Sequence, residues 1–552
     1  MDISYFLTRA ASLWPQKEAV VDDGKRFTYL ETWQRSKKLS HWLSVQGVER
    51  GQVVSMLAPN CHQFIEAYFA CAMLGAILNP INYRLSSREV AAILDDAGPC
   101  AVIVHDNFAG LYKDALALWL EADAGVTHEV PIAKKPVNVL VSAAPDSADK
   151  DSDSGEDSES ASNKGDFWLF YERILSEQEE QMLSQHSSPS FAPDTVANLY
   201  YTSGTTGNAK GVMLTYENVS CHALCTISEL KITDADVWLH AAPMFHLADA
   251  WAIYALTASG GCHVCLPFFK SGEVLRLIQE EKVTISNLIP TMLNAMVNDE
   301  SVNNWSYSSL RMLLSGGSSI SPETVRRISE AFQCEYVQTY GMTETSPYLT
   351  LSIPKASMMS RPPAELMKAR SRTGRPFMGV ELRVVREDGT DVAADDTEVG
   401  EIIAKGPIVT PGYWNKPSET AQAIRNGWLH TGDLAVIDDD GYLNIVDRKK
   451  DMIITGGENV YSTEVEHVLY EHPAVLECAV FGTADPQWGE AVTAAVVLRA
   501  NATATAHDLI EFVRGRIARY KAPRRIEFLA ELPKTGSGKI QKKMLREREL
   551  ST

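Results

Sequence analysis

Short apolar runs alternate with helix-like patterns through the first four hundred residues of the chain. Val53–Leu57 reads as a buried strand, Phe64–Leu78 as an apolar helix that stops before Asn79-Pro80, and Ala101–Val104 as the next strand. Strands that alternate with helices in this way form parallel sheets covered by helices. The pattern therefore predicts an α/β fold with parallel-rich sheets.

The length of 552 residues requires more than one core, because single domains seldom grow beyond about 250–300 residues. The texture changes after Asp433, where a strand at Tyr442–Val446 precedes the dense charge run Asp447–Asp451. Such a run is typical of an interdomain hinge. We predict a large domain over residues 1–447 and a small, mobile α+β domain over residues 448–552.

The small domain is expected to contain its own strands and helices. Its apolar patterns predict strands at Ala479–Phe481 and Val492–Leu498 and helices at Thr463–Tyr470 and Ala506–Tyr520. Thr463 and Glu466 have the spacing of a capping box at the start of the first helix.

One segment has the composition of a disordered loop. Between Asp146 and Glu159 there are seven acids, one lysine and many serines. Such a stretch cannot bury enough apolar surface to order itself. We predict a solvated, disordered acidic insertion over residues 143–164 and assign no chemistry to it.

The charge balance and the cysteines narrow the class of protein. A net charge of -20 argues against a nucleic-acid partner or an anionic membrane surface. The nine cysteines are odd in number and dispersed, which favours reduced thiols and a cytoplasmic protein. The N-terminal residues Ile3 to Trp14 predict a docking helix in place of a signal peptide, and the apolar stretch Ala67–Leu78 is too short to span a membrane. We expect no integral membrane segment and a monomer or homodimer.

Two close cysteine–histidine groups, Cys221-His222-Ala223-Leu224-Cys225 and Cys262-His263-Val264-Cys265, raise the question of zinc. The second group overlaps the apolar run Val264–Phe269, which predicts a buried strand. Buried free cysteine usually behaves as a small apolar residue, so we expect no zinc site.

A glycine- and hydroxyl-rich segment, Tyr201–Lys210, follows the apolar strand Val196–Tyr201. Glycines let backbone N–H groups approach phosphate oxygens, hydroxyls donate further bonds, and Lys210 adds a positive charge. Lys210 is followed by Gly211, so the segment is not the Gly-Lys-Ser/Thr phosphate loop. Composition alone leaves a plain turn and a phosphate loop both open.

The order of the residues is more informative than their composition. Tyr201–Gly211 resembles the signature of the adenylate-forming superfamily, which includes acyl-CoA synthetases, luciferases and adenylation domains. Further family-like segments follow in the expected order: Pro243-Met244-Phe245-His246, Ser315-Gly316-Gly317, Tyr340-Gly341-Met342-Thr343-Glu344, Thr431-Gly432-Asp433, Asp447-Arg448, Gly456-Gly457-Glu458-Asn459 and Pro533–Lys539. The resemblance spans nearly the whole chain, and it implies a β-barrel-like subdomain within the large domain.

This resemblance implies a nucleotide site. It assigns ATP binding to Thr202, Ser203, Gly204, Thr205, Thr206, Gly207, Lys210, Ser315, Gly316, Gly317, Gln338, Thr339, Tyr340 and Gly341. Thr343 would contact the AMP phosphate, and Glu344 would supply the oxygen ligand that Mg²⁺ prefers. Asp433 would accept the ribose hydroxyls, with Arg448 near the ribose or phosphate.

The resemblance also implies residues for the chemistry and for coenzyme A. Lys539 matches the catalytic lysine that bridges the acyl carboxylate and the α-phosphate. His246 matches the gating histidine between the acyl pocket and the thiol tunnel. Lys450 stands at the family's hinge position, and Gly456 and Gly457 match the loop that approaches pantetheine.

The implied activity is that of an acyl-CoA synthetase using ATP, Mg²⁺ and coenzyme A on a small carboxylic acid. The hydroxycinnamate-ligase pattern resembles His-Ile-Tyr at positions 246–248, and Ala248 replaces its phenol-facing tyrosine. The roomier pocket favours a medium- or long-chain fatty acid, while Asp249 could face a polar substrate or solvent. The alternatives are a 4-coumarate- or succinylbenzoate-like aryl ligase, loading of a carrier protein, and luciferase-like oxygenation. A non-catalytic nucleotide-binding protein would have lost key groups, and all of them are present.

Overall fold

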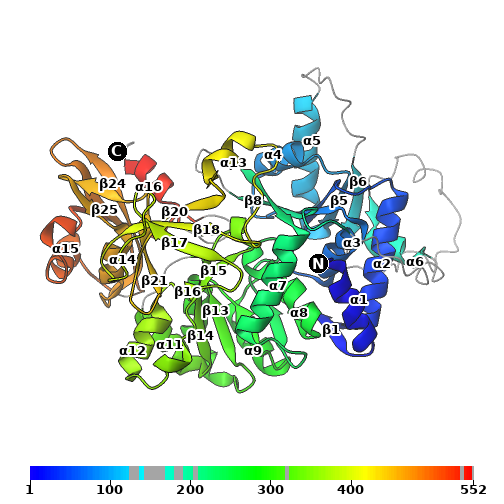
Figure 1. Cartoon of the computed structure of the whole chain (residues 1–552), viewed down its shortest axis with the longest axis horizontal. Helices are drawn as coiled ribbons and strands as arrows, with labels where there is room; N and C mark the ends of the chain where they lie inside the picture. Colours follow the sequence, from blue (N-terminus) through cyan, green and yellow to red (C-terminus); the bar gives the residue numbers. More distant parts are fainter. Residues whose placement is uncertain are drawn as a thin grey trace, which may run out of the picture. The chain divides into compact units, whose positions relative to one another are not determined.

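The computed structural model describes residues 1–123, 136–141, 168–178, 191–202, 209–317, 322–500, 502–534 and 540–549. The chain forms two compact units (Figure 1). The first comprises Met1–Phe269 and Thr410–Thr420, and the second comprises Lys270–Val409 and Ala421–Thr552. The acidic insertion at 143–164 lies outside the described residues, so its disorder stays a prediction.

A seven-stranded sheet lies in the first unit in the order β7-β6-β5-β3-β4-β8-β9. Every neighbouring pair is parallel except β8 and β9, which confirms the parallel-rich sheet predicted from the alternating pattern. Its strands are β3 (Val53–Leu57), β4 (Ile77–Pro80), β5 (Ala101–His105), β6 (Val137–Val141), β7 (Leu169–Phe170), β8 (Val196–Thr202) and β9 (Lys210–Thr215).

A second group of strands in this unit runs in the order β10-β11-β1-β2, with parallel pairs up to β1. These strands are β1 (Glu18–Asp22), β2 (Lys25–Thr28), β10 (Val237–His240) and β11 (Cys262–Cys265). The helices are α1 (Ser4–Leu13), α2 (Tyr29–Val45), α3 (His62–Leu74), α4 (Ser87–Ala97), α5 (Ala109–Asp123), α6 (Tyr171–Ser176), α7 (Tyr216–Leu230) and α8 (Leu247–Ser259). The strand predicted at Val264–Phe269 therefore begins and ends earlier than expected.

The apolar stretch predicted as one helix, Phe64–Leu78, is in fact a helix and a strand. Helix α3 ends at Leu74, because Gly75 takes a left-handed backbone with φ of 72°. A Cβ at Gly75 would lie 2.8 Å from Phe191 Cζ, so the turn also needs glycine for space. Ile77–Pro80 then forms β4.

The N-terminal helix is confirmed: α1 buries Phe6, Leu7 and Ala10 and packs against α8. Among the described residues, no group of three or more His, Cys, Asp and Glu side chains is placed to hold a metal ion. Cys262 and Cys265 are buried in β11.

The second unit contains strands in the order β16-β15-β14-β13-β12, parallel from β12 to β14 and antiparallel beyond. They are β12 (Ile285–Asn287), β13 (Met312–Ser315), β14 (Glu335–Gly341), β15 (Tyr348–Leu351) and β16 (Arg375–Pro376). The helices beside them are α9 (Ser271–Glu280), α10 (Pro290–Val297), α11 (Pro322–Phe332) and α12 (Pro363–Ser371).

The part expected to be barrel-like is a five-stranded antiparallel sheet in the order β17-β18-β20-β19, with β21 on β20. Its strands are β17 (Glu381–Val385), β18 (Gly400–Lys405), β19 (Ile424–Arg425), β20 (Trp428–Ile437) and β21 (Leu443–Arg448). Helix α13 (Pro417–Ala423) begins in the first unit and ends in the second. The boundary between residues 447 and 448 stays a prediction.

The C-terminal α+β part is built on a third sheet of this unit, in the order β23-β22-β25-β24 with β26 on β25. Helix α14 packs on β24 and on α15 (Figure 1). The elements are β22 (Ile453–Thr455), β23 (Glu458–Val460), α14 (Ser462–Tyr470), β24 (Val475–Asp485), β25 (Gly489–Leu498), α15 (Ala506–Arg514), β26 (Arg525–Phe528) and α16 (Lys542–Glu549). The helix predicted to reach Tyr520 ends at Arg514, before Gly515.

The predicted capping box at Thr463 and Glu466 is wrong. Helix α14 begins one residue earlier than expected and receives no side-chain cap. The Thr463 hydroxyl donates to the carbonyl of Val446, and Glu466 Oε1 accepts from the Val480 N–H at 2.8 Å. Both side chains are therefore used to join the helix to its neighbouring strands.

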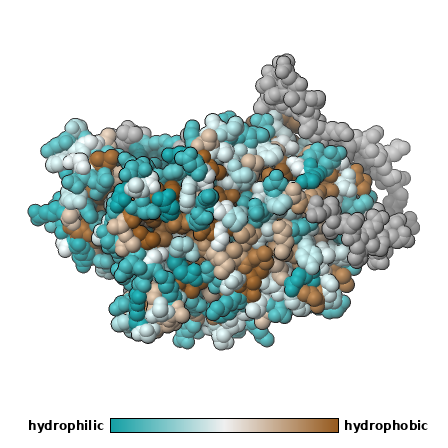
Figure 2. All heavy atoms as spheres, in the orientation of Figure 1, coloured by the Kyte–Doolittle hydropathy of each residue, from teal (hydrophilic) through white to brown (hydrophobic). Residues whose placement is uncertain are grey.

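Hydrophilic residues dominate the face drawn in Figure 2, with smaller hydrophobic areas between them. This agrees with 71 acidic and 51 basic residues in the chain. In the ranges that the structure covers, no helix is long and apolar enough to cross a membrane.

Candidate active site

The first unit carries the ends of the proposed phosphate loop. Thr202 ends β8 and Lys210 begins β9, and the two residues are Cα partners across this antiparallel pair. Tyr201 donates its hydroxyl to Asp96 at 2.7 Å, and Lys210 Nζ lies 5.1 Å from the centre of the Tyr413 ring. Burial, reinforced by Asp96, raises the pKa of Tyr201 far above its ordinary value, so it stays a neutral donor.

Ser203, Gly204, Thr205, Thr206 and Gly207 lie outside the described residues. The strands on either side of them, β8 and β9, form an antiparallel pair. Tyr413, which sequence reasoning missed, adds an aromatic face beside Lys210.

His246 stands at the N-terminus of α8, in the first unit. Its backbone is extended, with φ of −110°, and its Nδ1 accepts the N–H of Ala248 at 3.2 Å. The side chain therefore caps the helix through one ring nitrogen.

The sequence left open that Asp249 faces a polar substrate or solvent, and the structure shows neither. It is fully buried, and its carboxylate binds His240 Nδ1 at 2.6 Å and Trp238 Nε1 at 3.2 Å. His240 Nε2 lies 2.9 Å from His263 Nδ1, whose ring also contacts Thr257. Burial, followed by the nearby His240, lowers the pKa of His263 well below its ordinary value.

The second unit provides a shelf of small residues at the carboxyl ends of two parallel strands. Ser315 ends β13 beside Gln338 in β14, and Thr339 Oγ1 donates to the Ser315 carbonyl at 3.1 Å. A Cβ on Gly316 would lie 2.8 Å from the Thr339 carbonyl oxygen and closer still to its Oγ1. Gly317 has φ of 88°. The carboxyl ends of parallel strands are where open α/β sheets bind ligands, and only glycine fits this turn.

The end of β14 leads to Thr343 and Glu344. Gly341 packs so closely that a Cβ would collide with the Pro347 carbonyl, and Met342 N–H donates to that same carbonyl at 3.0 Å. Thr343 and Glu344 are half-buried in the 3₁₀ turn that follows. The carboxylate of Glu344 is a ligand type that suits Mg²⁺, which usually takes one or two protein carboxylates together with water and substrate phosphates.

Asp433 is the centre of a compact polar group in the second unit. It lies in β20 opposite Arg448 in β21, with Arg448 Nε 3.4 Å from Asp433 Oδ1. Tyr340 donates its hydroxyl to Asp433 Oδ2 at 2.8 Å. Burial and then Asp433 raise the pKa of Tyr340 well above its ordinary value, so the phenol remains a donor. The structure thus brings together three residues that the sequence separates by up to 108 positions.

The turn after β21 contains Lys450, which is exposed. The next residue, Asp451, receives an ion pair from Arg546 at 2.9 Å. Gly456 and Gly457 form the turn between β22 and β23, with φ of 61° and 85°. The Gly456 N–H donates to the Trp488 carbonyl at 2.8 Å, so Trp488, which sequence reasoning missed, supports this turn.

Lys539 lies outside the described residues, but both ends of its loop are described. Lys534 and Ile540 form an isolated antiparallel bridge, and Gln541 Nε2 donates to the Lys534 carbonyl at 2.8 Å. Beyond the loop, Lys542 Nζ binds Glu466 at 2.8 Å and Ser462 Oγ at 2.6 Å. The Lys539 loop therefore begins and ends at an anchored point.

Comparison with known proteins gives results that cover nearly the whole chain. A family model described as "AMP-binding enzyme" matches residues 7–414, and one described as "AMP-binding enzyme C-terminal domain" matches residues 464–539. Feruloyl-CoA synthase of an Amycolatopsis species is 34% identical over 544 residues, which cover 98% of this chain and 97% of that protein.

A long-chain-fatty-acid–CoA ligase of Bacillus subtilis is 32% identical over 550 residues, covering 98% of this chain and 94% of that protein. Among solved structures, o-succinylbenzoate CoA synthetase from Bacillus subtilis in complex with an acyl-adenylate intermediate has a TM-score of 0.78 and 28% identity. That match covers 99% of this chain and 97% of the other.

Proposed function

The chain belongs to the family of AMP-binding enzymes and is an AMP-forming acid–thiol ligase that uses ATP and coenzyme A; we propose that its acid substrate has an apolar acyl group, foremost a medium- or long-chain fatty acid. The burial of Asp249 supports this choice. Asp249 was the one charged candidate beside His246 and Ala248, and its carboxylate is already bound by His240 and Trp238. Recognition of a polar acyl group loses its main support.

An aryl acid is the second candidate. Phe245 packs edge-on against Tyr83 with ring centres 4.9 Å apart, and Tyr83 stacks on Phe108 at 4.7 Å. Aromatic side chains next to His246 suit a flat ring as well as an alkyl chain. The 34% identical relative that is named a feruloyl-CoA synthase supports the same alternative.

We assign the first half-reaction to adenylation. A carboxylate oxygen of the acid attacks the α-phosphorus of ATP, the bond from that phosphorus to the bridging oxygen breaks, and pyrophosphate leaves. Lys539 would bring its ammonium to the carboxylate and the α-phosphate, while Asp433 and Tyr340 hold the ribose. Mg²⁺, held by Glu344, would neutralise charge on the phosphate oxygens.

In the second half-reaction the sulfur of coenzyme A attacks the acyl carbon, the thiol proton is lost, and AMP leaves with the electron pair of the broken C–O bond. We propose that the C-terminal part turns about Lys450 between the two steps. This movement would withdraw Lys539 and bring Gly456 and Gly457 toward pantetheine. His246 would stand between the acyl group and the incoming thiol.

The division of labour is tested with Lys539→Ala. This variant should lose ATP–pyrophosphate exchange by a factor of about a hundred or more and still form thioester from supplied acyl-AMP. Removing one preorganised donor that stabilises developing negative charge typically lowers kcat by roughly 10²–10³. Lys543→Ala is the matched control, since Lys543 is an exposed lysine on α16. Equal loss in both half-reactions would contradict the assignment.

The substrate is tested with a panel of carboxylic acids from acetate to palmitate, together with benzoate and ferulate. AMP release is measured with and without coenzyme A. The proposal expects the highest kcat/KM for a medium- or long-chain acid. A higher value for ferulate or benzoate would make the aryl alternative the function.

A further inference from the structure

The connection that carries His246 is a six-residue segment, 241–246, between β10 and α8. Within it, the His246 N–H donates to the Pro243 carbonyl at 3.0 Å, and the Ala241 N–H donates back to Leu239 at 3.1 Å. Two further backbone groups of the segment, and the carbonyl of His240 just before it, are bound by one side chain 180 or more positions earlier in the chain. The place of His246 therefore depends on a distant residue.

That residue is Asn60, whose side chain is almost completely buried at 2% exposure. Its Nδ2 donates to the carbonyls of His240 and Ala242, each at 2.9 Å, and its Oδ1 accepts the Met244 N–H at 2.7 Å. One amide thus binds three alternate backbone groups just before His246. Only a side chain with two N–H donors and an acceptor can do so, which excludes a carboxylate or an alkyl group.

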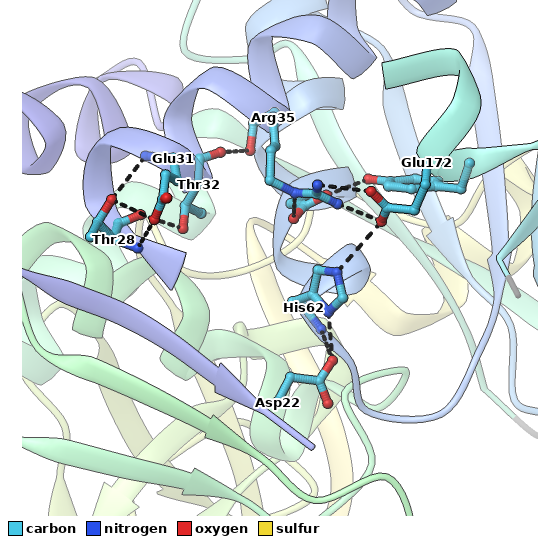
Figure 3. A network of polar contacts seen from close by, with 10 residues as sticks. Asp22, Thr28, Glu31, Thr32, Arg35, His62 and Glu172 are labelled. Carbon is cyan, nitrogen blue, oxygen red and sulfur yellow. Dashed lines mark hydrogen bonds and ion pairs between the residues drawn. The ribbon is translucent and has the colours of Figure 1, made fainter. Parts of the chain in front are cut away.

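Asn60 is itself held in place by the start of α3. The His62 N–H donates to Asp22 Oδ2 at 2.9 Å, and His62 Nδ1 contacts the same oxygen at 2.6 Å. Figure 3 shows Asp22 on one side of the His62 ring and Glu172, itself bound to Arg35, on the other. The turn that carries Asn60 is therefore fixed to β1 and α2 of the same unit.

The far side of His246 is fixed as well. Asp249, three positions later in α8, binds the ring of His240, and the carbonyl of His240 is one of the two that Asn60 binds. Residue 240 is thereby held through its side chain and its backbone at once. Tyr68 adds a hydrogen bond from its hydroxyl to the Met244 carbonyl at 3.2 Å.

From this geometry we propose that Asn60 is a positioning residue for His246. It fixes the backbone of segment 241–246, so that the imidazole stays where thioester formation needs it, while Asn60 itself acts only through that backbone. The inference rests on the proposed function, in which His246 stands between the acyl group and the thiol.

The test is a double-mutant cycle in the full-length chain. Asn60→Ala and His246→Ala are made singly and together, and each protein is assayed for ATP–pyrophosphate exchange and for thioester formation from supplied acyl-AMP. Hydrogen bonds of this kind contribute roughly 0.5–1.5 kcal/mol each, so losing three should slow thioester formation at least about tenfold. Exchange should fall less than about threefold, because adenylation precedes the attack of the thiol for which His246 is positioned.

Coupling is the decisive result. In the His246→Ala background, Asn60→Ala should slow thioester formation less than about threefold, because the imidazole that Asn60 positions is absent. An equal loss in both backgrounds, or an equal loss in both half-reactions, would overturn the role of Asn60. Absence of exchange by the wild-type chain with every acid would overturn the proposed function together with this inference.

Two further variants keep the result interpretable. Asn60→Asp retains the size of the side chain and the acceptor for Met244, and the cycle is run with it where Asn60→Ala does not fold. Asn79→Ala removes another buried asparagine of the same unit, whose Nδ2 donates to Ser55 Oγ at 2.9 Å. It should lower thermal stability without separating the two half-reactions, and a separation as large as that of Asn60→Ala would contradict the inference.

Discussion

Replacing Gly316 by alanine tests the nucleotide shelf directly. The new Cβ would lie 2.8 Å from the Thr339 carbonyl oxygen and closer still to Thr339 Oγ1. Real Cβ atoms do not approach backbone oxygen so closely, and one of the two segments must move. Thr339 follows Gln338 in β14, and Gln338 pairs with Ser315 in β13, so the sheet holds Thr339 in place. The segment after Ser315 is therefore the part that should shift.

The size of the effect follows from the cost of forcing an extra methyl group into a packed site. Such overpacking costs about 1–3 kcal/mol. Since each 1.4 kcal/mol is a factor of ten, KM for ATP should rise roughly fivefold to 150-fold if the strain is relieved by moving the shelf. The assay is ATP–pyrophosphate exchange at saturating acid, with the ATP concentration varied, and the melting temperature is recorded beside it.

Gly272→Ala is the matched control in the same unit. A Cβ at Gly272, near the start of α9, meets its nearest atom at 3.7 Å, an ordinary contact. Neither KM nor melting temperature should worsen, because alanine is also the better helix former. If Gly316→Ala kept KM for ATP within twofold of wild type at an unchanged melting temperature, the idea that Gly316 shapes the ATP site would be refuted.

Two more predictions concern named side chains. Tyr340→Phe removes the 2.8 Å hydrogen bond to Asp433 and should raise KM for ATP at least about tenfold, because hydrogen bonds to charged groups contribute about 1.5–3 kcal/mol. An unchanged KM in the exchange assay would show that this hydrogen bond does not support ATP binding. His62 gives a pH dependence. Burial alone would lower its pKa, but its contacts with Asp22 and Glu172 outweigh burial and raise the pKa above 6.5. A raised pKa stabilises the fold below pH 6.5 and loses this contribution as the pH rises through the folded value. Urea unfolding should therefore show a fall in the free energy of unfolding as the pH rises above 6.5, and His62→Gln should lack this fall. The same slope in both proteins would exclude His62 as its source.

The sequence predicts best where a pattern has one physical meaning. Val53–Leu57 and Val196–Tyr201 are short, largely apolar runs, and both are strands of the seven-stranded, mostly parallel sheet. The prediction of a single helix over Phe64–Leu78 was wrong, because a buried helix and a buried strand have the same apolar hydropathy. Only the left-handed Gly75, packed on Phe191, separates α3 from β4, and Phe191 is more than a hundred positions away.

Predictions from local spacing were also wrong where residues distant in the sequence bind the same polar side chains. Thr463 and Glu466 have the spacing of a capping box, yet Val446 and Val480 take their polar atoms. Asp249 resembles a residue of the acyl site, yet it is bound to His240 in the interior. In each case the sequence shows a side chain that can form a hydrogen bond, and only the fold decides with which partner.

The same reasoning explains why family motifs point to the proposed reacting groups and not to the residue that holds one of them. Asn60 follows Pro59 and precedes a helix, and by local chemistry alone it is a turn residue. Its three bonds reach a segment 180 to 184 positions later, where they bind backbone groups that any sequence would offer. No side chain in segment 241–246 therefore has to match Asn60. A residue that acts on the backbone leaves no partner pattern in the sequence, so the support of His246 becomes visible only in the folded chain.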